Sequence, residues 1–189
     1  MLQAVLGLIV LASQAAATPF WRAKERVYDK IQNREIIVSV SGPTGHLQVS
    51  GGGQIARSCA YTIEKSRDMK AAALSTGYID RAEFDSQSQI LKAHVKAYGL
   101  TAHIEMKMEM DEKKDPPTMA FRVLKGPLPG MTGSFEFFKV AAKKCDVGVD
   151  GTYKYEKFPL PAFFLKFGLE VMFQRMAGAI RRYVEEKAE

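Results

Sequence analysis

The sequence contains few of the residues from which catalytic and metal centres are usually built. Only three histidines and two cysteines occur among its 189 residues, and they are scattered along the chain. No serine, histidine and acidic residue have a spacing that predicts a catalytic triad. Gly51-Gly52-Gly53 is not followed by the Gly-Lys-Ser/Thr of a phosphate-binding loop. We therefore expect no catalytic residue, no metal and no cofactor, and the sequence favours a function other than catalysis.

Basic residues are in excess but are not concentrated. The formal net charge is +6, yet no run of lysine and arginine exceeds two residues. No basic stripe alternates with aromatic residues as a nucleic-acid groove requires, so nucleic acid is not an expected partner. The charge is consistent with an ordinary solvated surface, which we favour, or with peripheral contact to an anionic membrane. We expect a monomer.

The apolar run at the N-terminus is too short to suit a membrane span. Leu2–Ala12 is apolar apart from Gln3, and small residues follow it at the spacing that a signal peptidase needs. This pattern predicts a signal peptide over residues 1–17, cleaved after Ala15 or Ala17, although no basic residue precedes the run. An uncleaved apolar anchor is the less favoured alternative. The mature chain is then periplasmic or secreted, where both cysteines are candidates for a disulfide.

Residues 18–41 are expected to form an N-terminal extension made of a short helix and an extra strand. Apolar residues recur at helical spacing within Phe20–Arg34, and Arg34–Ser41 is rich in β-branched residues. The pair Phe20-Trp21 lies beside basic residues and is able to contact lipid headgroups. Docking of the segment on its own domain is the favoured interpretation.

From Gly77 onward, apolar residues recur at every second position, the period of a strand with one buried face. The alternation is clearest where Met106, Met108 and Met110 are interleaved with charged residues. Ser58–Leu74 is predicted to form one or two short helices. The succession of hairpins predicts an antiparallel sheet that is solvated on one side. The predicted strands are Arg34–Ser41, His46–Arg57, Gly77–Asp85, Gln89–Tyr98, Ala102–Asp111, Thr118–Lys125, Thr132–Ala141 and Cys145–Tyr155.

A long helix is predicted at the end of the chain. It follows Pro159-Leu160-Pro161 and continues without proline to Lys187. At 1.5 Å per residue such a helix is about 40 Å long, which is enough to cover the apolar side of the sheet. The residues that share its apolar face include Leu165, Leu169, Met172 and Met176.

Several short motifs resemble one known superfamily. They are Phe121-Arg-Val-Leu-Lys-Gly126, Gly130-Met-Thr-Gly133-Ser-Phe-Glu-Phe137, Gly151-Thr-Tyr-Lys-Tyr155, Leu160-Pro161 and Ala177 with Arg181-Arg182-Tyr183-Val184-Glu185. With the order of elements, they make Leu47–Glu185 similar to the START/polyketide-cyclase (SRPBCC) superfamily, which includes coenzyme Q-binding proteins. The resemblance implies an α+β helix-grip domain over residues 42–189. In that fold, a curved antiparallel sheet of six to seven strands wraps around a long C-terminal helix.

The resemblance also implies a cavity between sheet and helix for a hydrophobic ligand such as a lipid, a quinone or a polyketide-like molecule. Methionine, which is unbranched and polarizable, suits a pocket that adapts to a flexible ligand. The alternatives are a cyclase- or aromatase-type enzyme of the same superfamily, or a non-binding module whose cavity is filled by its own side chains. The expected lining is Met106, Met108, Met110, Phe121, Val123, Phe135, Phe137, Tyr153, Leu165, Leu169, Met172 and Met176.

The resemblance further implies a pairing of the two cysteines. In a helix-grip sheet the first and last strands are antiparallel neighbours. Cys59 follows the first of these strands and Cys145 begins the last, so we expect a Cys59–Cys145 disulfide. Two unrelated buried cysteines are the alternative.

Overall fold

The computed structural model describes residues 18–97, 99–156 and 162–186. Its elements follow the predicted order, except that the single helix expected near the N-terminus is two helices separated by Lys24, whose backbone is extended. The elements are α1 (Phe20–Ala23), α2 (Glu25–Gln32), β1 (Ile37–Ser41), β2 (His46–Ile55), α3 (Cys59–Arg67), α4 (Met69–Ser75), β3 (Ile79–Asp85), β4 (Ile90–Ala97), β5 (Leu100–Asp111), β6 (Thr118–Lys125), β7 (Thr132–Ala141), β8 (Lys144–Lys154) and α5 (Ala162–Glu185).

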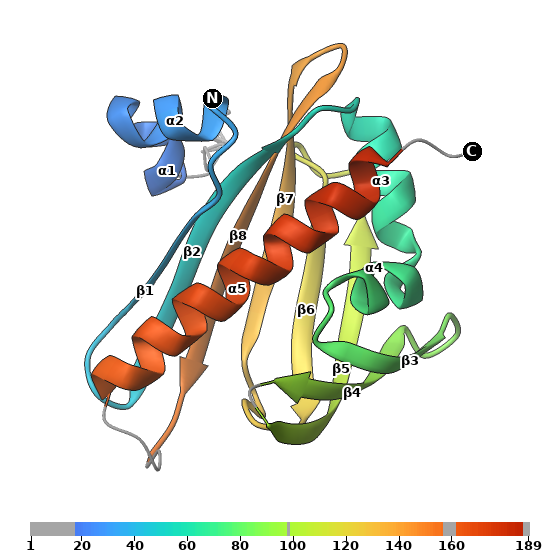
Figure 1. Cartoon of the computed structure of the whole chain (residues 1–189). Coiled ribbons are helices and arrows are strands. Elements are labelled where there is room, and N and C mark those ends of the chain that lie inside the picture. The colour runs from blue at the N-terminus through green and yellow to red at the C-terminus, as the bar shows by residue number, and fades with distance from the viewer. Residues whose placement is uncertain (1–17, 98, 157–161, 187–189) are drawn as a thin grey trace, which may run out of the picture.

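The strands form one curved antiparallel sheet in the order β1-β2-β8-β7-β6-β5-β4-β3 (Figure 1). The connection from β2 through α3 and α4 leads to β3 at the opposite edge, and the following strands return to β8, which pairs with β2. The first and last strands of the expected domain are therefore neighbours. The sheet has eight strands rather than six or seven, because β1 pairs with β2 and extends the edge. The α+β helix-grip prediction is confirmed, with this correction to the strand count.

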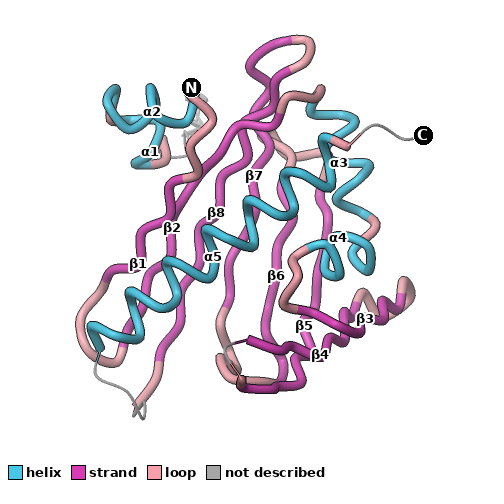
Figure 2. Tube along the Cα trace, viewed as in Figure 1, coloured by secondary structure: helices cyan, strands magenta, loops and turns pink. Residues whose placement is uncertain are grey.

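The long helix α5 crosses one face of the sheet, which we call the inner face (Figures 1 and 2). Its backbone comes close to β1 and β2 on one side and to α3 and α4 on the other. Val40 N donates to Glu170 Oε1 at 2.7 Å, and Gln174 Nε2 donates to Ile36 O at 2.7 Å. These bonds fasten α5 along β1, and the middle strands are left to meet it through their side chains.

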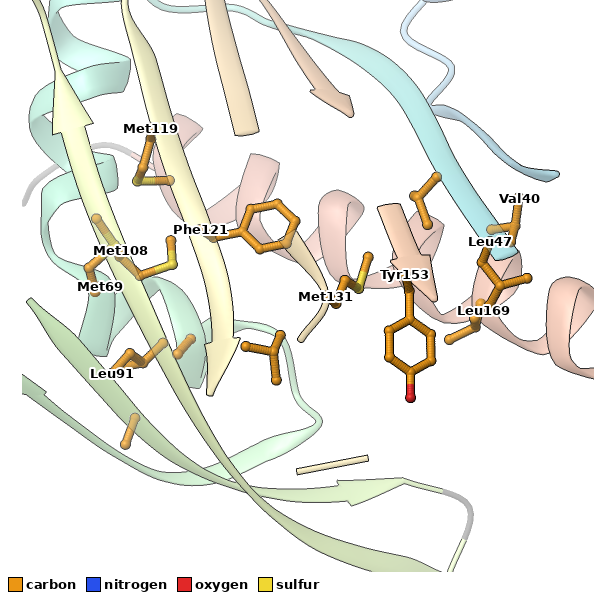
Figure 3. Packing of buried hydrophobic residues seen from close by; sticks show 14 of the residues in the cluster. Val40, Leu47, Met69, Leu91, Met108, Met119, Phe121, Met131, Tyr153 and Leu169 are labelled. Carbon is orange, nitrogen blue, oxygen red and sulfur yellow. The ribbon is translucent and has the colours of Figure 1, made fainter. Parts of the chain in front are cut away.

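Buried apolar side chains form one cluster between the sheet and α5 (Figure 3). The cluster draws on β1, β2, the strands from β3 to β8, and helices α3, α4 and α5. Each strand contributes alternate residues, as expected for a sheet with one buried face. None of the helices in the described part of the chain is long and apolar enough to span a membrane.

The predicted disulfide between Cys59 and Cys145 is present, with the two Cα atoms 4.8 Å apart. The register pairs Ile55, the last residue of β2, with Cys145 of β8. The chain leaves β2 after Ile55 and begins α3 at Cys59, which places Cys59 next to Cys145. The bond therefore links the start of α3 to the start of β8, and the Cys145 side chain is fully buried.

We expect reduction of this disulfide to destabilise the fold. The bond joins residues 86 positions apart, and closing so long a loop contributes about 4 kcal/mol in the chain-entropy model. Urea unfolding with and without a reducing agent measures this difference. The variant Cys59→Ser/Cys145→Ser is the control, since the reducing agent should not change its midpoint. An equal midpoint for oxidised and reduced wild type would contradict the prediction.

The outer face of the sheet holds Trp21, the only tryptophan of the chain, on a pair of glycines. Gly52 and Gly148 are cross-strand partners. A Cβ at Gly52 would lie 2.5 Å from Trp21 Cδ2, and one at Gly148 would lie 2.7 Å from Trp21 Cζ2. Because side chains alternate along a strand, Gly52 faces away from the buried Val49 and the inner cluster. The indole therefore lies flat on the side of the sheet opposite α5, and it is fully buried.

Polar contacts secure the same N-terminal segment. Tyr28 Oη donates to Asp146 Oδ2 at 2.8 Å, and Gln54 Nε2 donates to Asp146 Oδ1 at 3.0 Å. The Arg22 guanidinium lies 4.6 Å from the centre of the Phe138 ring. Docking of the segment on its own domain is thus confirmed, and a contact between Trp21 and lipid headgroups is wrong because the sheet buries the ring.

Replacing Gly148 by alanine should displace Trp21. The added Cβ would overlap the indole, and such overpacking costs about 1–3 kcal/mol. Because there is one tryptophan, its fluorescence maximum should shift to the red as the ring becomes exposed. Gly168→Ala is the matched control, since a Cβ at Gly168 meets nothing within 4 Å. An unshifted emission spectrum in Gly148→Ala would show that the indole does not depend on this glycine.

Candidate functional site

The candidate site is the apolar surface between the inner face of the sheet and α5. The structure brings eleven of the twelve residues expected to line a cavity into the inner cluster. Met176 is half-buried and lies outside it. The buried members are Met108, Phe121, Val123, Phe137, Tyr153, Leu165 and Leu169, and the partly buried ones are Met106, Met110, Phe135 and Met172.

The cluster also contains residues that the sequence analysis did not assign to the site. Met119 alternates with Phe121 on β6, so strand periodicity already indicated it. Met131 lies in the turn before β7, where no periodicity applies. Met69 comes from α4, which packs against β3 and α5. The inner surface is therefore richer in methionine than predicted (Figure 3).

A second glycine pair shapes the middle of this surface. Gly133 on β7 and Gly151 on β8 are cross-strand partners on the inner face. A Cβ at Gly133 would lie 2.6 Å from Phe121 Cζ, and one at Gly151 would lie 3.3 Å from both Phe121 Cζ and Met131 Cε. The Phe121 ring and the end of Met131 thus rest directly on backbone. Because Gly133 and Gly151 have no side chains, the space between β7, β8 and α5 is wider at this point. The Phe121 ring and the Met131 side chain occupy that space.

A hollow of about 560 Å³ opens at the end of the sheet near α3. Ile63 and Phe137 of the inner cluster form part of its wall, together with Cys59. Arg67 at the end of α3 forms an ion pair with Glu112 in the loop between β5 and β6, and both residues line the hollow. This hollow therefore connects solvent to the edge of the apolar cluster, and a surface ion pair lies across it.

A histidine pair on the outer face is a grouping that spacing did not reveal. The register of β4 and β5 places His94 opposite His103, with ring centroids 4.7 Å apart. His94 Nδ1 lies 2.6 Å from Asp80 Oδ1, and Lys96 Nζ lies 3.0 Å from Asp80 Oδ2. The hydrogen bonds from His94 and Lys96 lower the pKa of Asp80 to about 2. This exposed ion-pair network lies on the opposite face from the apolar cluster.

No metal centre is found in the part of the chain that the structure describes, where no group of three or more histidine, cysteine or acidic side chains is arranged to hold an ion. On β5, the charged residues interleaved with the methionines face solvent. Glu105 there pairs with Lys125 Nζ at 3.1 Å and Lys107 Nζ with Glu109 at 2.6 Å. The interpretation of this face as solvated is consistent with these contacts.

Three exposed phenylalanines stand at the start of α5. Phe163, Phe164 and Phe167 are 71%, 61% and 58% exposed, and their rings contact one another. We call these three residues the aromatic triad. Sequence reasoning treated this stretch only as part of a packing helix. The available signal was that Lys166 is the one charged residue in the first two turns, Ala162–Leu169, although one apolar face suffices for packing on the sheet.

Comparison with solved structures identifies the fold. A START superfamily protein from Mycobacterium smegmatis matches with a TM-score of 0.62 and 16% identity, covering 75% of this chain and 98% of that one. The Zhui aromatase/cyclase from Streptomyces sp. R1128 matches with a TM-score of 0.63 and 16% identity, covering 76% and 96%. A STAR-related lipid transfer protein from Xanthomonas axonopodis matches with a TM-score of 0.62 and 12% identity, covering 80% and 94%.

No family model and no curated protein matches the sequence. The sequence identities to the solved structures are low, so the likeness concerns the arrangement of the backbone. Almost the whole of each of the three proteins is matched. This chain therefore has the START, or SRPBCC, helix-grip fold.

Proposed function

We propose that this protein binds a hydrophobic ligand, such as a lipid, a quinone or a polyketide-like molecule, between the inner face of the sheet and α5. The observation that carries the proposal is the continuous methionine- and aromatic-rich cluster beneath α5, a helix that the side chains of Glu170 and Gln174 fasten to the β1 edge of the sheet. Solved structures of the same fold include a lipid transfer protein and an aromatase/cyclase. Binding would be driven by removal of the ligand's apolar surface from water, at about 25 cal/mol per Å².

Methionine would make room for the ligand. Met106, Met108, Met119 and Met131 belong to the cluster, and their side chains are able to change rotamer at small cost. The ring of Phe121 rests on glycine backbone, so its movement would uncover a flat surface on β7 and β8. The ligand would replace contacts that these side chains make with one another, while the backbone keeps its arrangement.

The hollow beside α3 is our proposed entrance. It reaches Ile63 and Phe137 at the edge of the cluster. The Arg67–Glu112 ion pair across it is exposed, with 58% and 43% of the two side chains accessible. Exposed ion pairs contribute about 0–1 kcal/mol, so this contact would open readily.

Export from the cytoplasm is part of the proposal. The Cys59–Cys145 disulfide supports it, because such bonds persist mainly in oxidising compartments. The signal peptide predicted over residues 1–17 lies outside the described residues. A cyclase-type reaction is the weaker candidate, since Tyr153 is the one residue with a hydroxyl group among the twelve expected lining residues.

Filling the site from the helix side should weaken ligand binding. We expect Met172→Trp to reduce the affinity for cis-parinaric acid about tenfold or more, because Met172 packs against the cluster and an added ring occupies the ligand's volume. Met176→Trp is the matched control on the next turn of α5, outside the cluster. Fluorescence titration measures affinity, and urea unfolding verifies that both variants fold. Absence of saturable binding by the wild type, with no apolar molecule co-purifying in native mass spectrometry, would support a filled core instead.

We further propose that the aromatic triad contacts an anionic membrane, from which a hydrophobic ligand would be drawn. Large exposed apolar patches commonly mark interaction sites. Lys166 lies between the triad residues in sequence, and its Nζ donates to Gly42 O at 2.6 Å, which holds the charge at the end of β1. The chain's net charge of +6 also favours binding to an anionic membrane surface.

Polar replacement of the triad should reduce membrane binding. We expect the wild type to co-sediment with phosphatidylglycerol vesicles and Phe163→Ser/Phe167→Ser to partition about tenfold less, because two rings no longer enter the interface. Leu74→Ser/Leu124→Ser is the control, since these leucines are 38% and 39% exposed elsewhere. Equal partitioning of the two variants would remove the triad from the membrane contact.

A further inference from the structure

Two of the three histidines lie side by side on the outer face of the sheet, on the opposite side from the inner cluster. The antiparallel register of β4 and β5 pairs His94 with His103, and the centroids of their rings are 4.7 Å apart. Opposite residues of two antiparallel strands hold their Cβ atoms about 4.5–5.5 Å apart, so both side chains reach one point above the sheet. We call these two residues the histidine pair. The strands that carry it adjoin β3, at the edge of the sheet opposite β1 (Figure 1).

Asp80 fixes the orientation of one of the two rings. Nδ1 of His94 lies 2.6 Å from Asp80 Oδ1, and Lys96 Nζ lies 3.0 Å from Asp80 Oδ2. The hydrogen bonds from His94 and Lys96 lower the pKa of Asp80 to about 2, so the carboxyl group is ionised and only accepts. Nδ1 of His94 therefore carries the hydrogen and donates it, and in the neutral imidazole Nε2 is then the nitrogen with a lone pair.

A β-bulge places Asp80 beside His94. The pairing of β3 with β4 shifts between Ile79, which lies opposite Val95, and Arg81, which lies opposite His94. Asp80 is the extra residue between them. Regular alternation would send its side chain to the other face, and a bulge of this kind redirects a side chain. The local backbone therefore brings a carboxylate to the face that carries the histidine pair.

We propose that the histidine pair chelates a divalent transition-metal ion, of which Zn²⁺ is the type, with Asp80 as the positioning residue behind His94. Imidazole nitrogen is a favoured ligand of zinc, nickel and copper ions. Two nitrogens that bind one ion at about 2.0–2.1 Å lie about 3 Å apart, which the two rings reach by turning about their side-chain bonds. A metal-binding histidine commonly donates its other N–H to a carboxylate, and Asp80 supplies this contact.

The proposed site is open to solvent. In the part of the chain that the structure describes, no group of three or more histidine, cysteine or acidic side chains is arranged to hold an ion, so water would complete the coordination. His103 is exposed, which gives an ion direct access to the pair. The charge of Lys96 is partly balanced by its ion pair with Asp80. We therefore expect an exchangeable ion that joins β4 to β5, on the face away from the proposed hydrophobic ligand.

Isothermal titration calorimetry with Zn²⁺ tests the site in the purified chain, after treatment with a chelator. We expect saturable binding of Zn²⁺ and none of Mg²⁺, which prefers oxygen ligands. His103→Gln removes one of the two ligands and retains His94 with Asp80. We expect its affinity for Zn²⁺ to fall about a hundredfold, because two ligands on one scaffold bind far more tightly than either alone.

Asp80→Asn tests the positioning residue, since it retains both imidazoles and removes the carboxylate. Its affinity for Zn²⁺ should fall about 10–100-fold, as is usual when an outer carboxylate partner of a metal-binding histidine is lost. Nitrogen NMR of the imidazole rings supplies a readout that a merely structural role would not change. In the absence of metal, the fraction of His94 with its hydrogen on Nδ1 should fall in Asp80→Asn. In the wild type, Zn²⁺ should shift the ring nitrogens of His94 and His103.

His46→Gln is the matched control, because His46 begins β2, which β8, β7 and β6 separate from β5. Its affinity for Zn²⁺ should equal that of the wild type, and the melting temperature of each variant without metal verifies that it folds. The proposal is overturned if the wild type shows no saturable binding of Zn²⁺, or if His103→Gln binds as tightly as the wild type. It is also overturned if His46→Gln loses as much affinity as His103→Gln. Equal affinities of Asp80→Asn and the wild type would overturn the role of Asp80.

Discussion

The attachment of α5 to the exposed edge of the sheet is the constraint on which the rest of the structure depends. Hydrogen bonds from Val40 N to Glu170 and from Gln174 to Ile36 O use backbone groups of the first strand and the segment before it. At the C-terminal end of α5, the carboxylate of Glu185 accepts hydrogen bonds from the Arg34 side chain and from Ala56 N. Polar bonds therefore determine where the helix lies, and the apolar side chains beneath it are free to adjust. A binding site for a flexible hydrophobic molecule requires this separation of roles.

Strand β8 organises both faces of the sheet. Its outward Gly148 joins Gly52 to hold Trp21, and its inward Gly151 joins Gly133 to hold Phe121. Glycine at these positions removes side-chain contacts within the strand. Each glycine pair instead makes room for a large aromatic ring that packs on the backbone. The N-terminal segment is thereby fixed to the outer face while the inner face remains wide. The disulfide at Cys145 secures the start of the same strand.

The polar and apolar surfaces of α5 divide its length into three parts. The aromatic triad stands at the N-terminal end, the residues that pack on the cluster follow, and a hollow lined by Arg175, Arg181 and Arg182 lies toward the C-terminal end. The first part is exposed, the second packs on the inner cluster, and the third borders a hollow. The helix therefore does not have one apolar and one polar face along its whole length. Two of the predicted packing positions show the division, since Leu169 is buried in the cluster whereas Met176, two turns later, lies outside it.

Patterns in the sequence were enough to predict the order of the strands and helices and the inner face of the strands. Alternation at Met106, Met108 and Met110 is a local property, so it was visible without tertiary information. The family resemblance supplied the neighbouring positions of β2 and β8, and with them the disulfide. The surroundings of Trp21, the strand to which α5 is bonded, and the hollow that Arg175, Arg181 and Arg182 share with Ile36 and Tyr78 became known from the structure alone. These facts depend on contacts between segments far apart in the chain, and periodicity along one segment carries no information about its partner.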